Sequence, residues 1–158
     1  MAEYCFDTSS IIHAWVRTYP PENFPTFWAR FDTAISSSLI VSPEDVRQEL
    51  AHPEDLKNWA KQRDQMFREL DNEIQESLKE ILRHIKSRLE RDGLTFREKD
   101  LKADPIVVAT ARVTRATVVV QETRRGGQGR PKIPDLCDHF EVPFTNLLGF
   151  IQSRNWKF

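Results

Sequence analysis

Cysteine, glycine and histidine are all scarce in this chain of 158 residues, which has two cysteines, five glycines and four histidines. The two cysteines, Cys5 and Cys137, lie beside apolar neighbours and form no CxxC pair, so we expect buried, reduced thiols. The histidines are widely scattered along the chain, which leaves a zinc site without support.

Long apolar runs and net charge are also missing. No apolar stretch approaches the ~20 residues that a membrane-spanning helix needs. The opening residues, MAEYCFDTSS, lack the charged leader and apolar run of a signal peptide, so we expect a cytoplasmic protein without a membrane partner. The formal net charge of -1 gives no general attraction to nucleic acid, so any such binding needs a local cluster of basic residues.

The composition that remains is that of a folded globular protein. The length is close to that of one domain of ~100–150 residues. Hydrophobic residues make up 39% of the chain and charged residues 30%. We see no repeat and no second core in the sequence, and we therefore expect residues 1–158 to form one domain.

Short β-rich segments alternate with helical patterns along the chain. The β-rich segments are residues 3–7, 39–41, 117–120 and 142–145. Helical patterns cover about 11–16, 24–31, 43–52, 54–68, 71–91, 104–111, 134–140 and 147–151. This alternation predicts an α/β fold with a mainly parallel central sheet, helices on both faces, and a charged helical insert at about 54–91.

Three helix starts can be predicted from capping residues. Ser42 is expected to be an N-cap with Pro43 in the first turn. Asp104 is expected to be an N-cap, or the residue before one, because Pro105 suits the first helical position. Asn146 is expected to cap the last helix.

Four acidic residues that are distant in the sequence are predicted to converge on one edge of the sheet. Asp7 and Glu122 follow strands, and Asp104 begins a helix that should face the same rim. Glu49 lies about two turns into the helix after the second strand. Because ligands of parallel sheets bind beyond the carboxyl ends of the strands, this edge is the expected site.

A cluster of four carboxylates points to a divalent metal. Their mutual repulsion costs free energy, which a hard cation offsets. Mg²⁺ and Mn²⁺ prefer oxygen ligands, and such ions activate water and stabilise the leaving oxygen of a phosphodiester. We therefore expect one or two Mg²⁺ or Mn²⁺ ions held by Asp7, Glu49, Asp104 and Glu122, with Asp135 as a fifth acid that competes with Glu122.

Each acid taken alone also has a purely structural explanation. Asp7 and Asp104 could simply cap helices. Glu49 could be one more surface acid, and Glu122 an ordinary turn acid. The prediction of a site therefore depends on the joint placement of the four residues.

Four motifs in this order resemble those of PIN domains. The segment YCFDTSSII resembles the opening of the family, in which an aspartate ends the first strand. Residues 46–50 (VRQEL) resemble its glutamate-bearing helix, 102–111 (KADPIVVATA) its third acidic motif, and 118–122 (VVVQE) the strand before its fourth acid. The chain also resembles a less-characterised bacterial branch, in which an aromatic FW segment, a long charged helical insert and a late KIPDLC segment recur. The resemblance covers nearly the full length.

The resemblance implies a metal-dependent endoribonuclease that leaves 5′-phosphate and 3′-hydroxyl ends. Two residues depart from the pattern, since PIN nucleases most often have Asn where this chain has Ser9, and Asp where it has Glu122. Many relatives are VapC-type toxins paired with a small antitoxin, and relatives often form homodimers. A cognate antitoxin and a second copy of the chain are therefore the implied protein partners.

Basic residues are concentrated around the fourth acid. Between positions 112 and 132 there are six basic residues and one acid, Glu122. The residues expected to contact RNA are Thr8, Ser9, Arg112, Arg124, Arg125, Arg130 and Lys132. The alternative is a solvated, flexible loop without a partner.

Other classes that place an aspartate after the first strand fit less well. A haloacid-dehalogenase phosphatase needs a second aspartate where this chain has Ser9. A response-regulator receiver needs a paired acid near the start and a late lysine on a strand, and neither is evident. A non-catalytic PIN-like module that binds RNA or a protein stays open, because Ser9 and Glu122 depart from the nuclease pattern.

Overall fold

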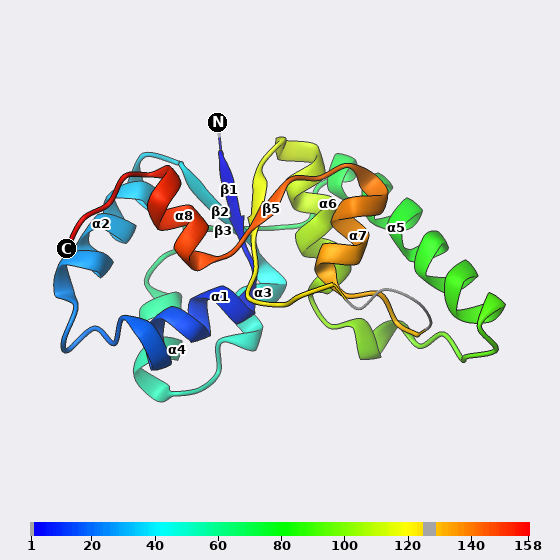
Figure 1. The fold of residues 1–158 in the computed structure, drawn as a ribbon, viewed down its shortest axis with the longest axis horizontal. Helices are drawn as coiled ribbons and strands as arrows, with labels where there is room; N and C mark the ends of the chain where they lie inside the picture. Colours follow the sequence, from blue (N-terminus) through cyan, green and yellow to red (C-terminus); the bar gives the residue numbers. More distant parts are fainter. Residues whose placement is uncertain (1, 125–128) are drawn as a thin grey trace.

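A sheet of five parallel strands lies at the centre of the molecule (Figure 1). The computed structural model describes residues 2–124 and 129–158, and the strands within these ranges are β1 (Tyr4–Phe6), β2 (Ile40–Pro43), β3 (Phe67–Arg68), β4 (Thr117–Val119) and β5 (Phe144–Thr145). Their order is β3-β2-β1-β4-β5, and every pairing is parallel, as predicted. The order of strands reverses between β1 and β4, which makes their carboxyl ends the switch point of the sheet.

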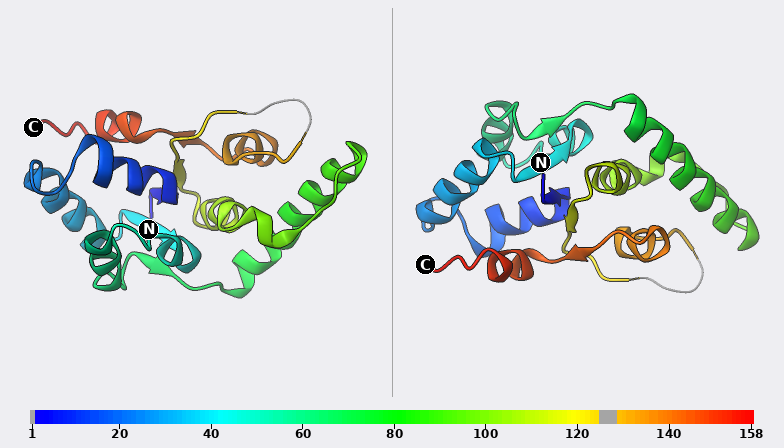
Figure 2. Two further views of the ribbon diagram at one scale, coloured as in Figure 1. Left: turned by 90° about the horizontal axis from the view of Figure 1, so that it is seen from below. Right: turned by 90° about the horizontal axis from the view of Figure 1, so that it is seen from above.

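Helices cover both faces of this sheet, which also confirms the prediction (Figure 2). In chain order they are α1 (Thr8–Ile12), continued by the π-helical segment η1 (His13–Thr18), α2 (Pro25–Ser36), α3 (Glu44–Glu49), α4 (Glu54–Lys61), α5 (Asn72–Arg91), the 3-10 segment η2 (Glu98–Leu101), α6 (Asp104–Thr114), α7 (Ile133–Phe140) and α8 (Leu147–Ser153). Helices α5, α6 and α7 lie on one side of the strands, and α1, α2 and α8 lie on the other.

The core on each face begins from side chains of β1. Phe6 is fully buried and makes edge-to-face contacts with Phe31 of α2 and Phe150 of α8, at centroid distances of 5.1 and 4.9 Å. Cys5 points to the opposite face, where its Sγ donates to the carbonyl of Val107 in α6. Successive residues of a strand point to opposite faces, so three residues of β1 are enough to anchor both helical layers.

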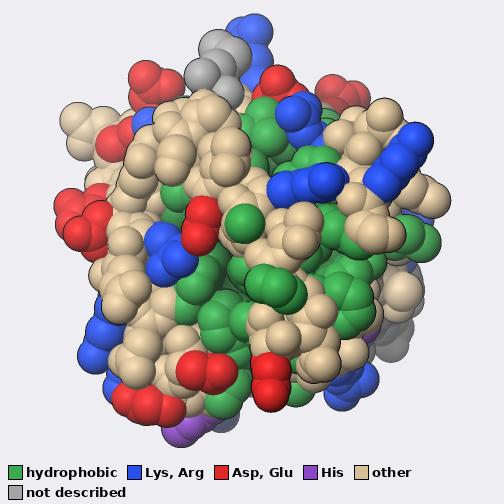
Figure 3. Space-filling view, turned by 90° about the vertical axis from the view of Figure 1, so that its left-hand side faces the viewer, with side chains coloured by type: hydrophobic (Ala, Val, Ile, Leu, Met, Phe, Trp, Pro, Cys, Tyr) green, Lys and Arg blue, Asp and Glu red, His purple; other side chains and the backbone are tan. Residues whose placement is uncertain are grey.

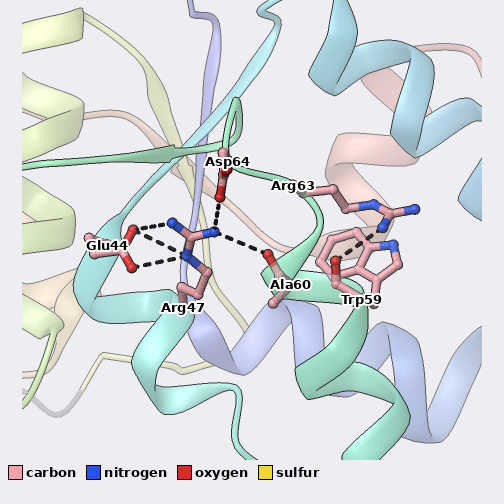
Figure 4. A network of polar contacts seen from close by, with 6 residues as sticks. All are labelled: Glu44, Arg47, Trp59, Ala60, Arg63 and Asp64. Carbon is pink, nitrogen blue, oxygen red and sulfur yellow. Dashed lines mark hydrogen bonds and ion pairs between the residues drawn. The ribbon is translucent and has the colours of Figure 1, made fainter.

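Arg47 of α3 ties together the segment around β3 (Figure 4). Its guanidinium donates to Glu44 at 2.8 Å, to Asp64 at 2.6 Å and to the Ala60 carbonyl at 3.4 Å. The guanidinium carbon also lies 5.0 Å from the centre of the Phe67 ring, within the range of a cation–π contact. These contacts hold the chain beside β2 after α4 has ended.

The predicted helix over 54–68 is therefore wrong in its second half. Helix α4 ends at Lys61, and Phe67 and Arg68 pair with Ser42 and Pro43 of β2. The insert at 54–91 thus consists of two helices with an edge strand between them. The pairing with β2 and the arginine contacts are tertiary interactions, which helix-forming residues near the segment do not reveal.

One predicted cap is wrong and another is confirmed. Ser42 is buried inside β2 and donates its hydroxyl to the Phe6 carbonyl at 2.7 Å, so that Pro43 occupies the cap position of α3. Strand pairing continues two residues further than the sequence suggests, to Pro43. Asn146 caps α8 as expected, because its Oδ1 accepts from the Gly149 N–H at 2.8 Å.

Hydrophobic side chains gather on the face formed by α2, α8 and the C-terminal residues (Figure 3). Trp156 and Phe158 pack against Phe27 at centroid distances of 5.7 and 5.8 Å. The C-terminal residues thereby cover the end of the core. Over residues 2–124 and 129–158, the structure holds no helix with the length and apolar character of a membrane span.

Candidate active site

The carboxyl ends of β1 and β4 open onto a pocket of about 480 Å³, which we call the acidic pocket. The predicted residues that line it are Asp7, Thr8, Ser9, Glu49, Asp104, Glu122, Arg130 and Lys132. The four predicted acids come from the ends of two strands, from α3 and from α6, and the fold brings all four to one place.

Asp7 lies at the centre of the switch point. Its backbone N–H donates to the Val119 carbonyl at 3.0 Å, which continues the β1–β4 pairing by one residue. Its Oδ2 accepts the Ser9 N–H at 3.2 Å and the Ser9 hydroxyl at 2.6 Å, so that Asp7 also caps α1. The side chain is only 3% exposed. Burial raises the pKa of Asp7 to about 6; the bonds from Ser9 oppose this shift, and the charge of Glu122 adds to it.

Ser9 joins the ends of the two central strands. Its hydroxyl donates to Asp7 and accepts the Gln121 N–H at 3.1 Å. The Gln121 side chain accepts in turn from the Leu147 N–H at the start of α8, at 2.6 Å. The residue that departs from the usual PIN asparagine therefore fixes both the Asp7 carboxylate and the chain that leads to Glu122.

Asp104 is the first residue of α6 and Ala103 is the cap, so Asp104 is neither the cap nor the residue before it, and the helix begins earlier than predicted. Burial is the main cause that raises the pKa of Asp104 to about 7; the charges of Asp7, Glu122 and Glu49 contribute to this shift, and Arg130 opposes it. The four acids are thus electrostatically coupled.

Glu49, the last residue of α3, connects the first and third motifs. Its Oε1 accepts the Thr8 hydroxyl at 2.5 Å, and its Oε2 accepts the Ala103 N–H at 3.0 Å. The residue before Ala103 is Lys102. Its backbone has a φ of 53° and a ψ of -133°, a conformation that residues other than glycine adopt only with strain. The strained turn directs the Ala103 N–H toward Glu49.

The donor set of the acidic pocket suits a hard divalent cation, because it consists of carboxylate oxygens whose repulsion a cation would relieve. In the part of the chain that the structure describes, no three His, Cys, Asp or Glu side chains form a ready set of metal ligands. Both oxygens of Glu49 and Oδ2 of Asp7 are engaged in hydrogen bonds within the protein. Each carboxylate oxygen has a second lone pair, so these hydrogen bonds orient the carboxylates and still leave them able to bind an ion.

Asp135, the competing fifth acid, lies at the start of α7 and not in the acidic pocket. Its Oδ2 accepts the backbone N–H of Lys132 at 2.9 Å, which completes the first turn of that helix. The geometry therefore places Glu122, and not Asp135, beside the other three acids.

Some of the basic residues predicted to contact RNA line the acidic pocket, and others do not. Arg130 and Lys132 line the acidic pocket, and the Arg130 guanidinium donates to the Asp100 carbonyl. Arg124 and Arg112 do not line it: they form ion pairs with acids of α7 and α5. Arg125 lies outside the described residues.

The acidic pocket also contains residues that the sequence did not single out, which are His13, Arg17, Asp100, Lys102 and Gln121. Two of them could have been found from local patterns. Lys102 and Gln121 each precede a predicted acid within its motif. His13 and Arg17 are four residues apart on the segment that continues α1, which places them on one face.

These features define the class of the protein. The sheet order and the flanking helices are those of a PIN-like α/β fold. The fold is similar to a chain of the DNA-bound VapBC complex from Salmonella typhimurium, with a TM-score of 0.54 and 15% identity over 92% of this chain and 98% of that chain. A chain of VapBC2 from Rickettsia felis, bound to a DNA fragment from its promoter, matches with a TM-score of 0.46 and 12% identity over 90% and 97%.

The chain itself belongs to the family described as "Domain of unknown function (DUF4411)", whose model matches residues 4–158. A comparison with curated proteins gives no match. At 15% identity the likeness to the VapBC chain concerns the fold alone, so the function must be argued from the acidic pocket.

Proposed function

We propose that this protein is a metal-dependent ribonuclease that hydrolyses phosphodiester bonds in RNA. The observation that carries the proposal is the convergence of Asp7, Glu49, Asp104 and Glu122 on one pocket at the switch point of a parallel sheet. A protein gains no stability from two buried acids whose pKa values are raised to about 6 and about 7. Keeping these two acids buried lowers the stability of the fold at neutral pH, and such a loss is typical of a functional site.

One or two Mg²⁺ or Mn²⁺ ions would be held by carboxylates of Asp7, Asp104, Glu122 and Glu49, with Glu49 keeping its bond from the Thr8 hydroxyl. When bound, the cation would supply an activated water molecule and neutralise charge on the phosphodiester. The protein's own part is positioning. Thr8 and Ser9 orient the Glu49 and Asp7 carboxylates, and the burial of Asp7 excludes bulk water from one side.

Basic side chains that line the acidic pocket are proposed to bind the phosphates of RNA. Arg130 and Lys132 line it from the segment before α7, and Arg17 and Lys102 line it from other segments. Their positive charges offset the acids and compensate for the net charge of -1 of the whole chain.

The test is cleavage of several RNAs with Mg²⁺ or Mn²⁺, compared between the native protein and Asp7→Asn. We expect the variant to lose cleavage by at least about a hundredfold, since a bound metal supplies several kcal/mol to the reaction. The matched control is Asp64→Asn, because Asp64 is an exposed acid that does not line the acidic pocket. The products of the native protein should carry 5′-phosphate and 3′-hydroxyl ends.

A second candidate is a non-catalytic PIN-like module that binds RNA or a protein. The observation in its favour is that both oxygens of Glu49 are already bound within the protein. Absence of cleavage by native protein and variant alike, on all RNAs and with both metals, would favour this reading.

We further propose that the protein acts as the toxin of a toxin–antitoxin pair and forms a homodimer. The support is the sequence resemblance to PIN domains and the likeness of the fold to a chain of a VapBC complex. Co-purification of a protein encoded beside the gene would support the pairing, and light scattering of the purified chain tests the dimer.

A further inference from the structure

A second pocket, of about 530 Å³, adjoins the acidic pocket, and Glu122 lines both. We call it the side pocket. Thr123 and Arg124 line it from the segment after β4, and Phe144 and Thr145 line it from β5. Because both pockets open at the carboxyl ends of the strands and share a wall residue, one extended ligand can occupy the two at once.

The side pocket has two flat surfaces held close together. The guanidinium carbon of Arg124 lies 4.8 Å from the centre of the Phe144 ring. Two hydrogen bonds to Asp138 of α7 hold the guanidinium there, one of them 3.0 Å long between Nη2 and Oδ1. The Arg124 side chain is nevertheless 60% exposed, so part of its surface is open to a ligand. Aromatic rings and guanidinium planes are the groups on which nucleobases stack.

The charges of the side pocket favour an uncharged ligand group. Asp138 offsets the positive charge of Arg124, and Glu122 adds a carboxylate at the boundary with the acidic pocket. A phosphate would be repelled there, whereas a base carries no charge. Thr123, Thr145 and Asn146 supply hydroxyl and amide groups that can hydrogen-bond to base edges.

The corner between β5 and α8 has a shape that depends on one glycine. A Cβ at Gly149 would lie 2.0 Å from Oγ1 of Thr145. The absence of a side chain at this position lets the Thr145 side chain stand over the first turn of α8, next to Asn146. Gly149 thus leaves the room that the Thr145 side chain occupies at the wall of the side pocket.

We propose that the side pocket binds the base of the nucleotide adjacent to the cleaved bond and stacks it on the open face of the Arg124 guanidinium, whose other face lies over the Phe144 ring. The inference rests on the proposed ribonuclease function, because it places a phosphate of the same strand among the four acids. It assigns base binding to Arg124 and a positioning role to Phe144, and it adds to the proposed phosphate contacts a contact to a base.

Binding is tested without cleavage, using a short single-stranded RNA that contains 2-aminopurine and the Asp7→Asn variant in EDTA. We expect the fluorescence of 2-aminopurine to be quenched on binding. Phe144→Leu keeps most of the volume of the side chain and removes the ring, and we expect it to weaken binding roughly tenfold. Arg124→Ala should weaken it to a similar extent. Thermal melting checks that each variant is folded.

The matched control is Arg63→Ala. Arg63 forms the same kind of paired contact with Asp32, at 2.8 and 2.9 Å. Its side chain lies beside Trp59 (Figure 4), and its guanidinium carbon is 4.7 Å from the Trp59 ring centre. It lines neither of the two pockets. Quenching and affinity should be unchanged in this variant. Equal affinity for native, Phe144→Leu and Arg124→Ala proteins, or a loss of the same size in Arg63→Ala, would overturn the proposal.

Cleavage provides an independent readout on the native protein. An abasic position on one side of the cut should slow cleavage about tenfold, and the same abasic position should have no further effect in Phe144→Leu. An equal effect in both proteins would mean that the base is bound elsewhere. If quenching and its loss in the variants are seen but no RNA is cleaved, hydrolysis fails and base binding stands. If RNA is cleaved with no response to abasic positions, base binding alone fails.

Discussion

Thr8 and Glu49 are 41 residues apart in the sequence, and the Thr8 hydroxyl donates to Oε1 of Glu49 at 2.5 Å. This bond fixes the acid of α3 against the start of α1, beside Asp7. A side chain that orients a metal ligand commonly contributes 10–100-fold to metal affinity. The bond therefore gives Thr8 a positioning role in the proposed metal centre.

Replacement of Thr8 tests this role. Thr8→Val keeps the shape and removes the hydroxyl, and we expect Mn²⁺ affinity, measured by calorimetry, to fall by about tenfold or more. Thr8→Ser retains the hydroxyl and should keep the native affinity. Equal affinities in the two variants would show that the bond does not orient a ligand.

Stability of the metal-free protein should depend on pH through Asp7. Burial raises the pKa of Asp7 to about 6 in the folded state, from about 4 when unfolded. The folded state therefore binds the proton more tightly, and the free energy of unfolding falls as the pH rises from about 4 to about 6. Asp7→Asn removes this titration and retains a capping side chain.

We expect Asp7→Asn to be about 2 kcal/mol more stable than the native protein at pH 7.5 in EDTA, and close to it at pH 4. Thermal melts at the two pH values measure the difference. Asp64→Asn, at an exposed position, should show no such pH-dependent gain. A gain of the same size at both pH values would contradict a buried, titrating Asp7.

A divalent cation should restore the stability that the buried, ionised acids remove. Asp104 is coupled to the other acids, and its pKa is raised to about 7. Mn²⁺ should therefore raise the melting temperature at pH 7.5, by an amount that grows with the logarithm of its concentration above Kd. The effect should vanish near pH 5, where protons occupy the carboxylates, and in Asp104→Asn. A shift that is independent of pH would point to binding elsewhere.

The site is predicted unevenly by the sequence. Asp7 can be found from local patterns, because a buried strand, small polar residues and a helix follow one another there. Glu49 depends on resemblance, since helical spacing alone does not separate it from surface acids. Its bonds to Thr8 and Ala103 join segments far apart in the chain, which no local pattern contains. Local patterns do not predict the side pocket either, because Arg124 and Phe144 come into contact only in the folded chain.

The fold shows the same limit. Long periodic helices such as α5 are predicted well, because Ile81, Ile85 and Leu89 repeat on one buried face. The two-residue strand β3 is missed, because its position is set by pairing with β2 and by Arg47 over Phe67. Elements defined by tertiary contacts, and not by periodicity, are the ones that escape sequence reasoning.

Lys102 offers a test of strain beside the acidic pocket. Its φ of 53° and ψ of -133° suit glycine, so Lys102→Gly should relieve strain of roughly 1 kcal/mol. Lys102→Ala removes the same charge without that relief. We expect both variants to bind RNA more weakly and only the glycine variant to gain stability against urea. Equal unfolding midpoints would exclude strain at this position.

We expect Arg112 to act in packing and Arg130 to act in RNA binding. Arg112 pairs with Glu80 at 2.6 Å and lies over the Phe140 ring at 5.1 Å, which links α6 to α5 and α7. Its side chain is 35% exposed, so Arg112→Ala should cost at most about 1 kcal/mol of stability and leave RNA affinity unchanged. Arg130 lines the acidic pocket instead.

Arg130→Ala should therefore lower RNA affinity and reduce the dependence of affinity on salt by about one phosphate contact. Fluorescence anisotropy with a labelled RNA, measured at several salt concentrations, gives both quantities. Loss of affinity in Arg112→Ala with a normal melting temperature would instead place Arg112 on the RNA path. In that case the bound RNA strand would have to extend from the acidic pocket across α6 toward the ion pair between Arg112 and Glu80. The protein would then contact a longer stretch of RNA than the two pockets alone require.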